Sequence, residues 1–126
     1  MEAKTMARMA RREILPASIG YSDELANGLS AKAAIGIDIA KTADKRLIDK
    51  LIALNDKLLK ATGKLEKDIK TSSSMKDALK LARYHRDAMI PDMDKLRAIA
   101  DELETLVDKT YWPFPTYTEI LSSVMY

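Results

Sequence analysis

The sequence predicts an all-α protein, an elongated up-down-up bundle of three long helices with a short fourth helix at its C-terminal end. The composition favours helices, because charged residues make up 32% and hydrophobic residues 47% of the chain, while only four of 126 residues are glycine. Apolar residues recur at three- and four-residue steps over three long stretches. Short connections separate these stretches, so consecutive helices should lie antiparallel.

The first predicted helix covers residues 2–35. Its apolar face consists of Met6, Ala10, Ile14, Ala17, Tyr21, Leu25 and Leu29. Pro16 lies inside this pattern and lacks a backbone donor, so we expect a kink or a short interruption near Leu15. The pattern starts with no N-cap residue before it, which predicts that the chain has been excised from a larger one.

The second predicted helix covers residues 43–70 and follows a connection at 36–41. Thr42 is the expected N-cap, with Asp44 in the first turn. The main apolar seam is widened by further apolar residues, which predicts contact with two partner helices. The seam consists of Leu47, Leu51, Leu54, Leu58, Ala61 and Leu65. Gly63 is expected to mark a close approach of another helix.

The third predicted helix covers residues 74–109 and follows a break in the pattern at residues 71–73. Ser74 and Asp77 are expected to form a capping box at its start. Pro91 should kink this helix as Pro16 kinks the first. Together with the last helix, these elements predict one helical domain over residues 1–126.

Residues 111–117 contain four of the chain's seven aromatic residues and two of its four prolines. The prolines fix two φ angles and remove two donors, which predicts a stiff extended arm that carries large apolar rings. We expect Trp112 and Phe114 to be buried against the first and third helices or against a partner. Thr116 and Glu119 form a capping box for the last predicted helix, residues 116–125. The candidate docking residues are Tyr111, Trp112, Phe114 and Tyr117.

Both proline-containing helices share a pattern of two arginines three residues apart, with a proline five residues after the second. The arginines are Arg8, Arg11, Arg83 and Arg86. One interpretation is a groove in which the guanidinium groups converge on an anion. We favour ion pairs with nearby carboxylates, or contact with a partner surface; the carboxylates are Glu13, Glu66, Asp68 and Asp87. Pairing the helices through their connections puts Pro16 opposite residue 63 and Pro91 opposite residue 53, about 15 Å apart along the axis.

Charge and composition argue against several functions. Twenty-one basic and nineteen acidic residues are interspersed and leave a formal charge of +2, which predicts no nucleic-acid partner. The chain has no cysteine and no apolar run of about 20 residues, so we expect a cytoplasmic protein without a membrane partner. His85 is the only histidine and has no carboxylates at metal-binding spacing, so we expect no catalytic residue, cofactor or metal in this chain.

Three segments, residues 7–17, 83–93 and 101–117, resemble the C-terminal region of type III glutamine synthetases. The match at 101–117, which includes Tyr111 to Tyr117, is the most specific. The resemblance implies a longer parent enzyme that makes glutamine from glutamate, ammonia and ATP with a divalent metal, in a ring-shaped oligomer. It implies a non-catalytic helical domain with a structural, oligomer-packing or regulatory role. Its partners would be the catalytic domain, which lies upstream and is absent here, and neighbouring subunits.

Two other functions stay open. Small all-helical chorismate mutases carry inward arginines and a motif loosely like residues 46–54, although Arg46 lies off the apolar seam. Such an enzyme would turn over chorismate. A helical adaptor for an anionic partner would instead bind in a salt-sensitive way through Arg8, Arg11, Arg83 and Arg86.

Overall fold

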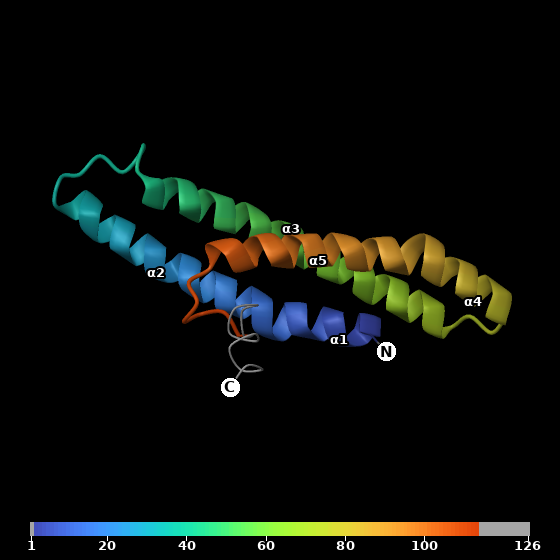
Figure 1. Ribbon diagram of the computed structural model, residues 1–126. Coiled ribbons are helices and arrows are strands. Elements are labelled where there is room, and N and C mark those ends of the chain that lie inside the picture. Colours follow the sequence, from blue (N-terminus) through green and yellow to red (C-terminus); the bar gives the residue numbers. More distant parts are fainter. Residues whose placement is uncertain (1, 114–126) are drawn as a thin grey trace, which may run out of the picture.

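The computed structural model describes residues 2–113, which form an antiparallel bundle of three helical rods (Figure 1). The first rod consists of α1 (Glu2–Met9), the π-helical segment η1 (Ala10–Ile14) and α2 (Leu15–Ala34). The second rod is α3 (Ala43–Ser73). The third rod consists of α4 (Ala78–Tyr84), the π-helical segment η2 (His85–Met89) and α5 (Ile90–Leu106). The described residues contain no strand, and the all-α class is confirmed. The predicted helix at 116–125 lies outside the described residues, as do Phe114 and Tyr117.

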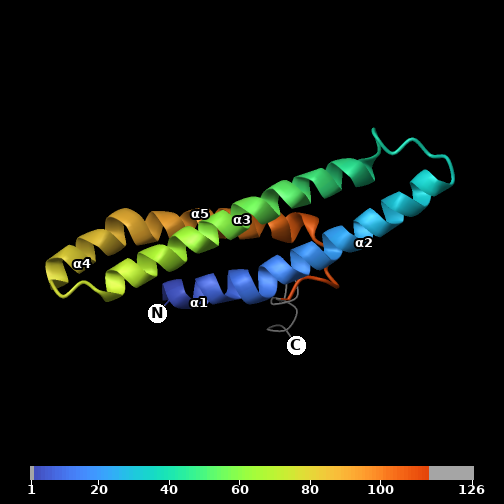
Figure 2. The same ribbon diagram turned by 180° about the vertical axis from the view of Figure 1, so that it is seen from behind.

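The helix α3 is the central rod of the bundle. It contacts α1 and α2 of the first rod and also α5 of the third, as its wide apolar seam predicts. Figure 2 shows the rods lying side by side along their length, with the α2–α3 end extending beyond α5. The molecule is therefore elongated, and each level of its core contains few side chains.

Leucines supply most of the buried core. Leu51, Leu58 and Leu65 of α3 have 0% exposure, and Leu96 and Leu103 of α5 pack with them. Burial of each such side chain stabilises the fold by roughly 1.5–3 kcal/mol. The first rod contributes mainly small side chains at its start, which are Ala3, Ala7 and Ala10. These small residues allow α1 to approach α3 closely.

Each of the two prolines in the helices lies two residues after the end of a π-helical segment. The Leu15 N–H donates to the Ala10 carbonyl, five residues back, and the Ile90 N–H donates to the His85 carbonyl in the same way. Pro16 and Pro91 then occupy the first turn of the next α-helix, where a missing donor costs little. The interruption expected near Leu15 is thus present, and it takes the form of a widened turn.

The widened turn changes which residues of α2 face the core. Ser18 and Ser22 are buried, whereas the expected face contained Ala17 and Tyr21, which are only half-buried. The expected face is correct in part, because Leu29 is buried and Tyr21 and Leu25 pack against the core. The most buried positions after η1 are nevertheless one residue later than expected, as an extra residue in the preceding turn produces. The serine hydroxyls are satisfied, since Ser18 donates to the Asn55 side chain and Ser22 donates to the Ile19 carbonyl.

Helix ends follow standard capping chemistry at the α2–α3 connection. The Thr42 hydroxyl accepts from the Lys45 N–H at 3.3 Å, which confirms Thr42 as the N-cap. Gly36 adopts a φ of +92° after the last turn of α2. Its N–H donates to Ala33 O, and the Ile37 N–H donates to Lys32 O. This is the Schellman pattern, which needs a left-handed residue.

The expected capping box of Ser74 with Asp77 was wrong. The helix α3 continues through Ser73, and the Ser74 hydroxyl donates to the Thr71 carbonyl. Serine and threonine hydroxyls bond to carbonyls of the preceding turn here, so these residues remain helical. Asp77 alone caps α4 by accepting from the N–H groups of Leu79 and Lys80.

Gly63 does not mark a close helix approach, and that expectation was also wrong. A Cβ built at Gly63 would meet no atom within 4 Å.

The third rod ends earlier than expected. The helix α5 ends at Leu106, and Val107 is extended. The chain therefore leaves the third rod about three residues before the expected end.

Candidate functional site

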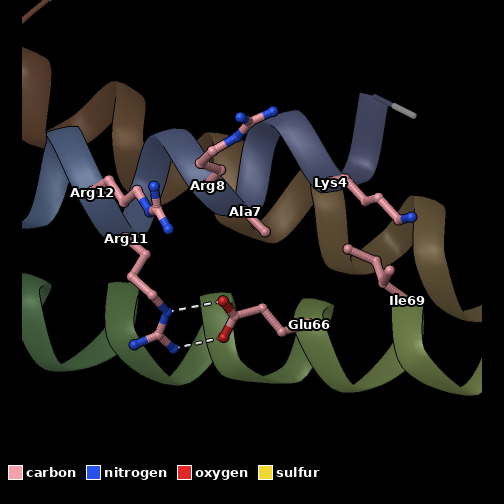
Figure 3. Close-up of a pocket in the computed structure, with 7 residues that line it drawn as sticks. All are labelled: Lys4, Ala7, Arg8, Arg11, Arg12, Glu66 and Ile69. Carbon is pink, nitrogen blue, oxygen red and sulfur yellow. Dashed lines mark hydrogen bonds and ion pairs between the residues drawn. The ribbon is translucent and has the colours of Figure 1, made fainter.

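A basic groove lies between α1, η1 and α3 (Figure 3). It has a volume of about 320 Å³ and is lined by Lys4, Ala7, Arg8, Arg11, Arg12, Glu66 and Ile69. Arg11 reaches across it and binds Glu66 with two bonds, Nε to Oε2 at 2.9 Å and Nη2 to Oε1 at 2.6 Å. The hydrogen bond and the negative charge of Glu66 raise the pKa of Arg11 above its ordinary value. Arg11 is thus already paired within the chain.

The other cations of the α1–α3 groove are exposed. No ion pair joins Lys4, Arg8 or Arg12 to a residue in the described part of the chain. In Figure 3, Arg8 extends along the outer side of α1, away from Glu66. The groove therefore presents three cations to solvent beside one neutralised pair.

The second pair of arginines does not join the first. Arg83 and Arg86 are exposed on α4 and η2, and neither lines the α1–α3 groove. The Arg86 Nε donates to Asp87 Oδ1 at 3.0 Å, and Asp87 raises the pKa of Arg86 by this bond and by its charge. Of the ion pairs that we expected, those of Arg11 with Glu66 and of Arg86 with Asp87 are present.

The prolines are offset along α3, but in the opposite order from the one expected. Ser18, two residues after Pro16, contacts Asn55, whereas Asp92, next to Pro91, contacts Lys64. Pro91 therefore lies beside a later part of α3 than Pro16 does. The expected order was wrong because both hairpins are centred elsewhere than assumed. The contact of Ser18 with Asn55 places the first centre nearer the N-terminus, and the contact of Asp92 with Lys64 places the second nearer the C-terminus, where α3 continues to Ser73.

The aromatic arm begins by folding back onto the first rod. The Asp108 side chain accepts from the Thr110 N–H and hydroxyl, both at 2.9 Å, and these bonds lower the pKa of Asp108. The turn directs Tyr111 onto Tyr21 of α2, with ring centroids 5.4 Å apart. Trp112 is half-buried and packs against the core.

Glu24 also helps to hold Tyr111. Its hydrogen bond with the phenol, together with burial and the Glu24 charge, raises the pKa of Tyr111. Gly20 lies below the ring, and a Cβ built there would be 3.7 Å from it. The first two of the four candidate docking residues are therefore in contact with their own bundle.

A partly buried polar cluster links α3 to the third rod, and sequence reasoning missed it. Asp68 is only 5% exposed and Asp92 only 8% exposed. The Lys64 Nζ lies 3.2 Å from Asp68 Oδ2 and 3.3 Å from Asp92 Oδ2, and the Tyr84 hydroxyl donates to Asp68 Oδ1 at 2.8 Å. The helical spacing of Lys64 and Asp68 was the only sequence signal for this cluster.

Other features bear on metal, membrane and enzyme functions. Within residues 2–113 no group of three or more potential metal-binding side chains comes together. In that same part of the chain, no helix combines the length and the apolar character needed to cross a membrane. Arg46, the residue compared with chorismate mutases, is exposed and donates to the Lys41 carbonyl at the end of the bundle.

These features define the class of the protein, an antiparallel three-helix bundle with basic surface grooves. The chain is 30% identical to a glutamine synthetase of Butyrivibrio fibrisolvens, over 98% of the chain and 18% of that enzyme. It is 38% identical to a type-3 glutamine synthetase of Dictyostelium discoideum, over 59% of the chain and 9% of that enzyme. No model of a known protein family matches the sequence. The chain is thus related to a short segment of much longer glutamine synthetases, type III included.

Proposed function

We propose that this chain is a non-catalytic helical domain of a type III glutamine synthetase. The observation that carries the proposal is the match itself, which covers 98% of the chain but only 18% of the Butyrivibrio enzyme. In the proposed parent, other parts of the polypeptide bind ATP, a divalent metal and glutamate and make glutamine with ammonia. The bundle contributes by packing on the catalytic domain and on neighbouring subunits, or by transmitting control between them.

The surface of the bundle supports a packing role. Several large apolar side chains are exposed, including Ile52 at 51% and Leu59 at 45% on the same side of α3. A partner that packs on this side of α3 would remove both side chains from water.

His85 lines a cavity with Ser72 and Ser73, but both hydroxyls donate to carbonyls of their own helix, at Ile69 and Lys70, and no carboxylate lines that cavity to orient the histidine. Among the described residues, no two carboxylates line any one of the five cavities.

Two experiments test the proposal. The chain alone, supplied with glutamate, ammonia, ATP and magnesium, should form no glutamine, and measurable turnover would overturn a non-catalytic role. In the Butyrivibrio enzyme, deletion of the matching segment should reduce the assembled oligomer or its activity. Full assembly together with full activity and unchanged inhibition by glutamine would contradict both the packing and the regulatory role.

A further inference from the structure

A second groove, between α3 and α5, has an apolar floor. It has a volume of about 480 Å³. Its floor is formed by Ala61 of α3 and by Ala98 and Ile99 of α5. The two alanines keep the helices' side chains short at this level, so an additional helix can approach the bundle closely. Water covers this apolar surface in the isolated chain, which favours its burial under a partner.

Lysines surround this floor on both sides. Lys57, Lys60 and Lys64 lie at three- and four-residue steps along one face of α3, and Lys95 faces them from α5. Asp92 is the one carboxylate that lines the groove, and it is bound to Lys64. The pairs within residues 2–113 include none that neutralises Lys57, Lys60 or Lys95. We call this site the lysine groove.

The residue types indicate the chemistry of a partner. A lysine side chain has a long apolar stem below a mobile ammonium group, so the four stems extend the floor while the charges stay at its edge. A helix with apolar side chains on one face and carboxylates beside them matches both features. Nucleic acid offers no apolar face for Ala98 and Ile99, and its phosphates are more often read by arginine.

The α1–α3 groove is a weaker candidate for such a partner. There the carboxylate of Glu66 lines the groove and already forms an ion pair with Arg11. We propose that the lysine groove is a docking site for an acidic amphipathic helix of a partner protein segment. The proposal concerns the chemistry of the partner and does not depend on which enzyme supplies it.

The test measures binding of a fluorescent acidic amphipathic peptide, with leucines on one face and glutamates on the other, to the full chain by anisotropy. In Lys57→Glu/Lys60→Glu/Lys95→Glu, affinity should fall about tenfold or more, because three attractive charges become repulsive. The matched control is Lys67→Glu/Lys70→Glu/Lys80→Glu, which changes the net charge equally at exposed positions outside the groove. It should lose no more than about threefold, and circular dichroism checks that both variants remain helical.

The apolar floor is tested separately with Ala98→Gln, an exposed position where a larger polar side chain leaves the core intact. Binding should weaken about threefold or more with all lysines present. Equal loss in the two charge variants would overturn the proposal, because it would show general attraction between opposite charges. Absence of peptide binding, or tighter groove-dependent binding of duplex DNA or of phosphatidylserine vesicles, would also overturn it.

Discussion

At the residue scale, Gly36 and Gly63 occupy opposite backbone situations. Gly36 has a φ of +92° in the turn that ends α2, whereas Gly63 lies inside α3 with open space where a Cβ would be. Gly36→Ala should therefore lower the free energy of unfolding by about 1–2 kcal/mol. Gly63→Ala should raise it by about 0.5–1 kcal/mol, because alanine restricts the unfolded chain and favours the helix. Urea titration measures both, and destabilisation by Gly63→Ala would contradict the open surroundings.

The bond from Tyr84 to Asp68 gives a second prediction at this scale. This hydrogen bond, followed by burial, raises the pKa of Tyr84 above its ordinary value. The folded state therefore holds the phenolic proton of Tyr84 more tightly than the unfolded state does. The stability that this proton adds to the fold is complete below the ordinary tyrosine pKa and disappears as the pH rises through the raised pKa. Tyr84→Phe should lower stability at pH 7 by about 1–2 kcal/mol, because the buried Asp68 loses a donor.

Thermal melts of Tyr84→Phe and the unchanged chain at pH 7 and in the alkaline range measure this effect. The difference between the two proteins should shrink at alkaline pH. Tyr21→Phe serves as a comparison, because the pKa of Tyr21 is also raised, mainly by burial. The difference in stability between Tyr21→Phe and the unchanged chain should therefore also shrink at alkaline pH, although it involves no bond to a buried carboxylate. A constant difference between Tyr84→Phe and the unchanged chain at every pH would contradict the linkage.

At the scale of single elements, the two π-helical segments each correspond to one extra residue in the apolar repeat. Met89, the last residue of η2, and Met93, Leu96 and Leu103 of α5 all reach the core with η2 in place. Removing one residue from η2 should convert it into ordinary α-helix, and the residues of α4 and α5 on either side should keep their orientation toward the core. Removing one residue from the α-helix itself should rotate all later core residues by about 100°.

This contrast is testable with two deletions of the same residue type in a Pro91→Ala background, where a continuous helix meets no proline ring. Deletion of Asp87, exposed in η2, should preserve the cooperative thermal transition with a loss below about 2 kcal/mol. Deletion of Asp94, exposed in α5, should cost more than about 4 kcal/mol, because it moves Leu96 and Leu103 out of the core. Similar losses in both deletions would contradict the account.

The helices themselves were predictable from the sequence, but the π-helical segments were not. The apolar repeat shows where a helix runs, and Pro16 shows where its hydrogen bonding must change. The extra residue is hidden because the buried positions after it are Ser18 and Ser22, whose polarity favours assigning them to solvent. The burial of Ser18 depends on Asn55 across the bundle, and such a partner is visible only in three dimensions, whereas the Ser22 hydroxyl is satisfied by the Ile19 carbonyl of its own helix.

At the scale of the whole molecule, periodicity predicted the bundle but not the alignment of its grooves. The level at which Arg11 meets Glu66, or Asp92 meets Lys64, depends on where each hairpin is centred. Moving the centre of a hairpin by three residues changes the residue opposite a given position by six, which shifts that level by about 9 Å. The lysine groove could not be predicted for this reason, since its lysines come from two helices whose register the sequence leaves open.

The return of the chain onto α2 after the third rod links the last described residues to the overall stability. Trp112 is the chain's only tryptophan, and its half-buried ring packs against the core next to the Tyr111–Tyr21 contact. Trp112→Ala should lower the free energy of unfolding by about 1–3 kcal/mol, because the ring is only partly removed from water. Trp112→Phe should recover most of this loss. Urea unfolding followed by circular dichroism measures both, and tryptophan emission in the unchanged chain should lie to the blue of the unfolded value. Unchanged stability in Trp112→Ala would mean that this contact contributes nothing to the fold and that the ring is available to a partner.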